Sequence, residues 1–280
     1  MDPEINKRLK HKAKTEKDKS TVQPTVINDV LIREYIIRYN KENSIYDQND
    51  LPVWNLTHLA LSYKNIIDIK NLDGLDKLTK LQLDNNIIMK IDNLGHLKNL
   101  RWLDLSFNLI SKIENLDSLT KLTDLSLYSN HISKLEGLEP LTELNVLSIG
   151  KNRITNLDET VQYLKGLKNK LEVLKLAENP FNIVGQNDQD YKLYTIEVLK
   201  DLKYLDYELI NENQRNQASA KYGETLNELE NQQNADKQDD GDKEVDQELV
   251  EAKIDCTHKM IQKIIDHHTY PKEELMLFQQ

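Results

Sequence analysis

The side chains that most resemble a metal site lie toward the carboxyl end of the sequence. Asp239, Asp240 and Asp242 form a short acidic cluster, and His267 and His268 are adjacent. A calcium loop needs further ligands and a glycine at set positions, and the acidic cluster lacks that spacing. Adjacent histidines on a helix do not share a face, so they are poorly placed to chelate one ion. The sequence therefore predicts no metal site.

Catalytic and nucleotide-binding motifs are not found either. The eight glycines are scattered and form neither G-x-x-x-x-G-K-[ST] nor G-x-G-x-x-G, and no H-E-x-x-H occurs. The single cysteine, Cys256, excludes an intramolecular disulfide and a zinc site built on paired cysteines. We expect a protein without enzymatic activity and without a cofactor.

Side chains suited to protein recognition are more evident. Trp102 and Tyr128 stand among Asp84, Asp104 and Asp124 at intervals of about one repeat. Aromatic anchors beside ionic groups are typical of binding hot spots. They can act together only if segments about 22 residues apart lie side by side. The candidate partner-binding residues are Lys80, Asp84, Trp102, Asp104, Asp124, Tyr128, Val146 and Val173.

A repeat of that length runs through the middle of the chain. Five leucines recur every 22 residues and a sixth follows after 27, each beginning the pattern L-x-x-L-x-[LI]: Leu56, Leu78, Leu100, Leu122, Leu144 and Leu171. The rest of each unit steps by three, as in Ile88, Ile91, Leu94 and Leu97. This pattern is identified as a leucine-rich repeat of the short 22-residue class.

The repeat predicts the fold. The alternation in L-x-L indicates a strand with leucines inward and the intervening residues outward. The step of three suits short 3₁₀-like turns. One unit cannot bury its own leucines, so we expect an α/β solenoid with a parallel sheet on its concave face. A structural asparagine ladder is expected where each strand turns, at Asn86, Asn108, Asn130, Asn152 and Asn179. The candidate binding residues then share the concave face.

The flanks predict caps and charged extensions. Apolar residues at helical spacing before the repeats and within 191–210 favour helical caps. Residues 1–20 carry seven bases and four acids, whereas residues 224–251 carry eleven acids and two lysines. We expect a basic arm at 1–24, a cap helix at 25–55, repeats at 56–182, a second cap at 183–229, an acidic linker at 230–247, and a coiled-coil-like helical segment with a tail at 248–280. With no secretory signal and no long apolar run, a cytoplasmic protein is expected.

Several segments point to a particular kind of repeat protein. The segments LQLDNNII at 81–88, RWLDLSFNLISKIENLDSL at 101–119 and LTDLSLYSNHISKLEGLEPL at 122–141 closely resemble the leucine-rich-repeat subunit (subunit 3) of the nexin–dynein regulatory complex of motile cilia. Two further features are similar to that family. Lys64 stands where the first ladder asparagine would be, and YLDYELI at 204–210 leads into AKYGETLNELE.

The resemblance implies a non-enzymatic scaffold of the ciliary axoneme, a part of the cytoskeleton. Such a subunit would link doublet microtubules and help to regulate dynein-driven motility. It would belong to a hetero-oligomer with other coiled-coil subunits of the complex, with doublet microtubules and dynein as further candidate partners. It implies no nucleic acid and no membrane as partners.

Three other proteins with similar repeats remain as alternatives. They are a regulatory subunit of protein phosphatase 1, an axonemal dynein light chain and a spliceosomal leucine-rich-repeat protein. The outward positions of the predicted sheet are not basic, which disfavours direct nucleic-acid contact.

Overall fold

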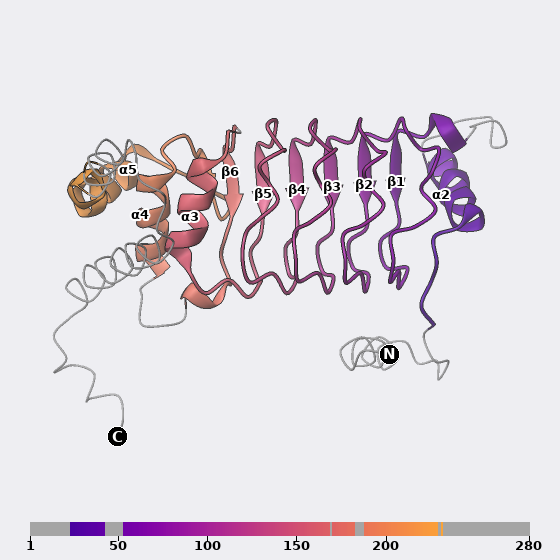
Figure 1. Cartoon of the computed structure of the whole chain (residues 1–280), viewed down its shortest axis with the longest axis horizontal. Coiled ribbons are helices and arrows are strands. Elements are labelled where there is room, and N and C mark those ends of the chain that lie inside the picture. Colours follow the sequence, from indigo (N-terminus) through magenta and orange to yellow (C-terminus); the bar gives the residue numbers. More distant parts are fainter. Residues whose placement is uncertain (1–22, 43–52, 169, 183–187, 229–230, 232–280) are drawn as a thin grey trace, which may run out of the picture. The chain divides into compact units, whose positions relative to one another are not determined.

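The computed structural model describes residues 23–42, 53–168, 170–182, 188–228 and 231 (Figure 1). The helical segment at 248–280, all but one residue of the expected acidic linker and all but two residues of the basic arm lie outside this range. The chain divides into two compact units, residues 1–218 and 219–280. The first unit holds all the repeats. In the second, the described residues include a π-helical turn, η3 (Ser219–Gly223).

A row of short parallel strands forms the centre of the first unit. The strands are β1 (His58–Ala60), β2 (Lys80–Gln82), β3 (Trp102–Asp104), β4 (Asp124–Ser126), β5 (Val146–Ser148) and β6 (Val173–Lys175). They pair in chain order, so that Leu59 lies beside Leu81, and Leu81 beside Leu103. Figure 1 shows them as successive turns of one solenoid. The predicted leucine-rich-repeat solenoid is confirmed.

The leucines of successive turns form a continuous core. The central leucine of each strand and the flanking leucines of the motif are almost fully buried, as in Leu100, Leu103 and Leu105. Behind the strands, the amides of Leu97 and Leu100 donate to the carbonyls three residues earlier, with N···O distances of 2.9 Å. Equivalent bonds recur in neighbouring turns. These are the expected short 3₁₀-like turns.

Buried asparagines connect each turn to the preceding one. The side-chain amide of Asn108 donates to the carbonyls of Leu83 and Leu105, both at 3.0 Å, and its carbonyl oxygen accepts from the amide of Ile88 at 3.0 Å. The other members of the asparagine ladder repeat this pattern. All are buried: Asn86, Asn108, Asn130, Asn152 and Asn179. In the preceding turn, Lys64 stands where the ladder asparagine would be. Its backbone amide donates to the Asn86 side chain.

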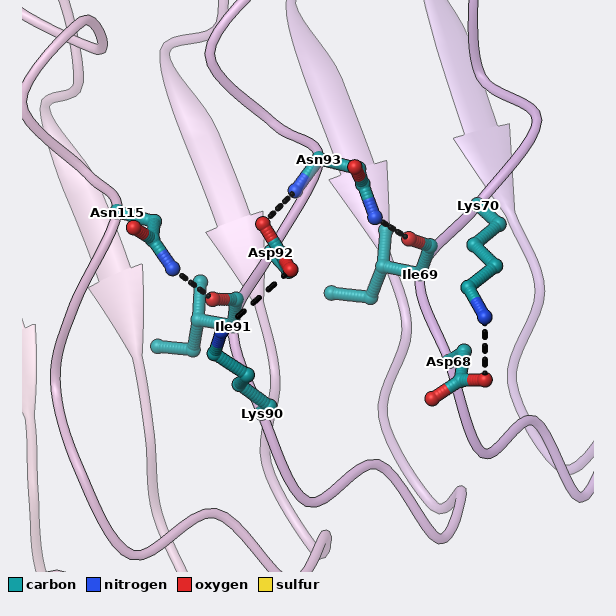
Figure 2. A network of polar contacts seen from close by, with 8 residues as sticks. All are labelled: Asp68, Ile69, Lys70, Lys90, Ile91, Asp92, Asn93 and Asn115. Atoms are coloured by element: carbon teal, nitrogen blue, oxygen red, sulfur yellow. Dashed lines mark hydrogen bonds and ion pairs between the residues drawn. The ribbon is translucent and has the colours of Figure 1, made fainter.

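A second asparagine ladder also connects neighbouring turns (Figure 2). Asn71, Asn93 and Asn115 have positive φ angles of 56 to 59°. The Nδ2 atom of Asn93 donates to the carbonyl of Ile69, and that of Asn115 to the carbonyl of Ile91, both at 2.7 Å. Asparagine tolerates the left-handed conformation better than most residues, and here its amide satisfies a carbonyl of the previous turn.

Gly137 takes the next position in this second ladder. Its φ is +68°, and an added Cβ would lie 2.9 Å from the carbonyl oxygen of Ile113. The chain therefore approaches the previous turn more closely here than a side chain allows.

Helix α2 (Asp29–Glu42) covers the first turn. It buries Leu31, Ile32, Tyr35 and Ile36. The Asn28 side chain accepts from the amide of Leu31 at 2.9 Å, which caps the helix. Asn71 donates to the carbonyl of Ile27 at 2.7 Å and so joins the cap to the second ladder. A short 3₁₀ turn, η1 (Val53–Asn55), precedes β1.

The last turns change from 3₁₀-like to α-helical structure. They contain α3 (Leu157–Gly166), η2 (Pro180–Asn182), α4 (Asp188–Val198), the strands β7 (Tyr204–Leu205) and β8 (Glu208–Leu209), and α5 (Glu212–Ala218). The longer fifth unit provides α3. Strand β7 extends the sheet in parallel, and β8 returns antiparallel to it.

Replacing Asn108 by alanine tests the first ladder. We expect the Asn108→Ala variant to lose about 2–4 kcal/mol of unfolding free energy, because two buried carbonyls and a buried amide lose their partner. Denaturant unfolding of the purified chain measures this. Asn99→Ala, at an exposed asparagine, is the control and should cost less than about 1 kcal/mol. Equal losses for both variants would contradict the assigned role.

Two glycine substitutions should have opposite effects. Gly137→Ala should destabilise the chain by about 1–2 kcal/mol, because its φ is positive and the new methyl meets a carbonyl oxygen. Gly166 lies at the end of α3, where an added Cβ would meet no neighbouring atom within 4 Å. Gly166→Ala should therefore be neutral or stabilise the chain by up to about 1 kcal/mol. Thermal unfolding of both variants distinguishes the signs. A neutral Gly137→Ala variant would disprove the close approach.

Candidate protein-binding surface

The outward residues of the strands form continuous columns across the sheet. In the first column Lys80 pairs with Trp102, Trp102 with Asp124, and Val146 with Val173. The second contains Gln82, Asp104, Ser126, Ser148 and Lys175. A third follows the strand ends at Ser62, Asp84, Ser106, Tyr128, Gly150 and Ala177. We call these three columns the strand face. It contains all eight candidate binding residues.

Trp102 lies half-buried in the first column beside a lysine. The Nζ atom of Lys80 is 4.2 Å from the centroid of the Trp102 ring. Such a cation–π contact holds the indole in place. The indole remains partly accessible, because the burial pattern of β3 leaves both its outward residues at intermediate exposure. Trp102 is therefore a fixed aromatic side chain available to a partner.

Acidic side chains lie near Trp102 in neighbouring columns. The Asp84 carboxylate accepts from the Ser62 hydroxyl at 2.5 Å and from the Asn85 side-chain amide at 2.6 Å. Asp104 accepts from the backbone amide of Ser106 at 2.9 Å. Burial raises the pKa of Asp104 above its ordinary value, and the nearby Asp84 carboxylate adds to this, while Ser106 and Lys80 oppose it.

Asp124 belongs to the same acidic group. Its carboxylate accepts from the Thr123 hydroxyl at 2.6 Å. The three acids thus have hydrogen-bonding partners that fix their positions. Asp104 and Asp124 are half-exposed and available to a basic or amide-rich partner segment, whereas Asp84 is buried.

The other end of the strand face carries an aromatic and ionic cluster. Tyr128 packs edge-on against Phe107 with ring centroids 5.4 Å apart, and its hydroxyl donates to Glu178 at 2.6 Å. The Nζ atom of Lys175 is 4.1 Å from the ring centroids of both Tyr128 and Tyr207. Burial, followed by the effect of the Glu178 carboxylate, raises the pKa of Tyr128 to about 12. Tyr128 therefore stays a hydrogen-bond donor at neutral pH.

Gly150 makes room for this cluster. A Cβ on Gly150 would lie 2.8 Å from the Ala177 carbonyl oxygen and 3.2 Å from Cδ2 of Tyr128. A larger residue at this position would therefore meet the Tyr128 and Lys175 side chains. Four further residues belong to this cluster but were not among the predicted binding residues: Phe107, Lys175, Glu178 and Tyr207. The repeat pattern does place Lys175 at an outward strand position. Tyr207 lies in the β7–β8 turn, which does not follow the 22-residue spacing of the repeats.

Within the described residues, no group of three or more histidine, cysteine or acidic side chains could hold a metal ion. In the same part of the chain, no helix has the length and apolar character needed to span a membrane. The acidic cluster at Asp239, the two adjacent histidines and Cys256 lie outside the described residues.

Residues 103–232 match the family described as leucine-rich repeat. No curated protein matches the chain. Among solved structures, a chain of the SNF/U2A' complex from Drosophila melanogaster is 27% identical with a TM-score of 0.38, and the match covers 61% of this chain and 87% of that one.

Two bacterial structures are similar to the same extent. An internalin (inlF) from Listeria monocytogenes is 28% identical with a TM-score of 0.43, and the match covers 58% of this chain and 52% of the internalin. A leucine-rich-repeat protein of Leptospira interrogans is also 28% identical, with a TM-score of 0.43, and the match covers 55% of this chain and 37% of that protein.

The leucine-rich repeats indicate a scaffold for protein–protein interaction. Proteins of this fold typically bind other proteins and carry out no reaction themselves.

Because the pKa of Asp104 is raised, replacing this residue should increase the free energy of unfolding by an amount that depends on pH. A carboxyl whose pKa is higher in the folded than in the unfolded chain destabilises the fold above that pKa, and this cost disappears once both states are protonated. Asp104→Asn keeps an oxygen that accepts from Ser106 and removes the charge. We expect the variant to be more stable than the parent at pH 7. The gain should shrink as the pH falls through the raised pKa of Asp104, as urea unfolding at several pH values can measure. A gain that grows on acidification would contradict the assigned direction.

Proposed function

We propose that this chain is a non-enzymatic scaffold subunit of the nexin–dynein regulatory complex in the axoneme of motile cilia. In this role it binds other coiled-coil subunits of the complex, helps to link doublet microtubules and helps to regulate dynein. Its proposed location is the cytoplasm, within the ciliary cytoskeleton.

Two independent features support the proposal. The segments at 81–88, 101–119 and 122–141 resemble the leucine-rich-repeat subunit of that complex over consecutive repeats. The strand face also has the composition of a recognition surface, with Trp102 held beside Lys80 and close to hydrogen-bonded carboxylates. The fixed position of Trp102 is the observation that carries the binding role.

The proposed mode of binding follows from the strand face. An amphipathic helix or extended segment of a partner lies across the strands, with an apolar side chain against Trp102. Its basic or amide side chains reach the half-exposed Asp104 and Asp124 carboxylates. Because the strands are fixed by the buried ladders, little ordering of this surface is needed on binding.

Crosslinking of native axonemes followed by mass spectrometry tests the assignment. Crosslinks from Lys80 and Lys175 on the strand face to coiled-coil subunits of the complex are the expected result. Recovery of a phosphatase catalytic subunit, dynein heavy chain alone or spliceosomal proteins would replace the proposal by the corresponding alternative.

Removing the Trp102 side chain should weaken partner binding. We expect Trp102→Ala to reduce affinity for the crosslinked subunit about 30-fold or more, because a buried aromatic anchor commonly contributes about 2 kcal/mol or more. Binding can be measured by calorimetry with the purified partner. The matched control is Trp54→Ala, since Trp54 is 65% exposed in η1 and lies outside the strand face. An unchanged affinity with the fold intact would remove Trp102 as the anchor.

A further inference from the structure

Helix α2 has apolar side chains on two opposite faces. One face packs on the first turn through Leu31, Ile32, Tyr35 and Ile36. On the other face, Val30 is 64% exposed and Ile37 is 52% exposed. A cap normally presents a polar outer surface, since its purpose is to end the apolar core. The outer face of this cap therefore needs another explanation.

Two charged residues lie between these exposed apolar residues. Arg33 and Glu34 are both exposed, and neither forms an ion pair with another described residue. At about 100° per residue, Val30, Arg33, Glu34 and Ile37 fall within about 100° of the helix circumference. We call these four residues the outer stripe of α2. It reads apolar, basic, acidic, apolar along the helix.

The outer stripe is complementary in charge and apolar character to the outer stripe of a second, antiparallel copy of the helix. The midpoint between Val30 and Ile37 is also the midpoint between Arg33 and Glu34. An antiparallel helix of the same sequence, related by a two-fold axis at that midpoint, puts Val30 against Ile37 of the second copy. The same axis puts Arg33 against Glu34 of the second copy, and the reverse pairs follow by symmetry.

We propose that the outer stripe of α2 is a homodimer contact, with a second copy of this chain as its occupant. Antiparallel α2 helices cross at their Arg33–Glu34 positions, where two reciprocal ion pairs form between two apolar contacts. An unrelated partner would need to supply the matching acid, base and apolar residues, whereas a second copy supplies all of them in register.

The size of the stripe sets the strength of this contact. Stable interfaces bury about 1,200–2,000 Å² in total, and four side chains per copy on one helix provide less. The dimer is therefore weak and depends on protein concentration. It leaves both strand faces available, so a pair of chains could hold two partners and gain avidity when those partners are linked. This contact does not depend on the proposed axonemal role.

A charge-exchange experiment on the full chain tests the proposal. Sedimentation equilibrium over a wide range of concentrations should show a reversible monomer–dimer equilibrium. Arg33→Glu and Glu34→Arg should each raise the dissociation constant about tenfold or more, because each places like charges opposite each other at the axis. The double variant Arg33→Glu/Glu34→Arg should restore association to within about threefold of the parent.

Apolar substitutions complete the test and control for folding. Val30→Glu should abolish dimerisation, whereas Leu209→Glu, at a residue 61% exposed in β8, should leave it unchanged. Circular dichroism must show the same helix content and melting for each variant. A chain that stays monomeric at all concentrations overturns the proposal. So does a dimer that Val30→Glu leaves intact, or one that the double charge variant does not restore.

Discussion

The structure depends on one constraint: a repeat this short cannot satisfy its own buried polar groups. The turn after each strand leaves backbone carbonyls and amides out of reach of water. Asn108 satisfies two carbonyls, one from its own turn and one from the turn before, and accepts from a third backbone group. Because each ladder asparagine serves two turns, neighbouring units stabilise each other, and an isolated unit would leave these groups unpaired.

This arrangement separates stability from recognition. The inward leucines and the ladder asparagines maintain the register of the sheet, while the outward residues contribute little to it. Exact strand pairing then makes side chains 22 residues apart into neighbours, as in Lys80 and Trp102. The outward side chains of the strand face can therefore differ from turn to turn without altering the backbone that supports them. The mixture of an indole, carboxylates and a tyrosine–lysine cluster is an example of this freedom.

The same reasoning explains what the sequence could and could not predict. The leucines and the asparagines that follow the strands recur at fixed positions of a known repeat pattern, so the strand positions and the first ladder follow directly from the spacing. The second ladder was also visible as Asn71, Asn93 and Asn115 at intervals of 22 residues. Its role depends on a left-handed backbone conformation, which spacing alone does not specify. The spacing of the repeats does not predict the contact of Lys175 with Tyr207, because the longer fifth unit and the β7–β8 turn bring these residues together.

The end of the sheet links this contact to the cap. Asp206 and Tyr207 in the β7–β8 turn both have positive φ angles, which cost free energy in residues other than glycine. Hydrogen bonds of the two side chains offset that cost. The Asp206 carboxylate accepts from the amides of Leu176 and Ala177 at 2.8 Å and from the Tyr191 hydroxyl at 2.6 Å. The Tyr207 hydroxyl accepts from Lys175 at 2.9 Å. The turn that closes the solenoid thus also positions Lys175 beside Tyr128, so the aromatic cluster of the strand face and the carboxyl-terminal cap form one structural unit.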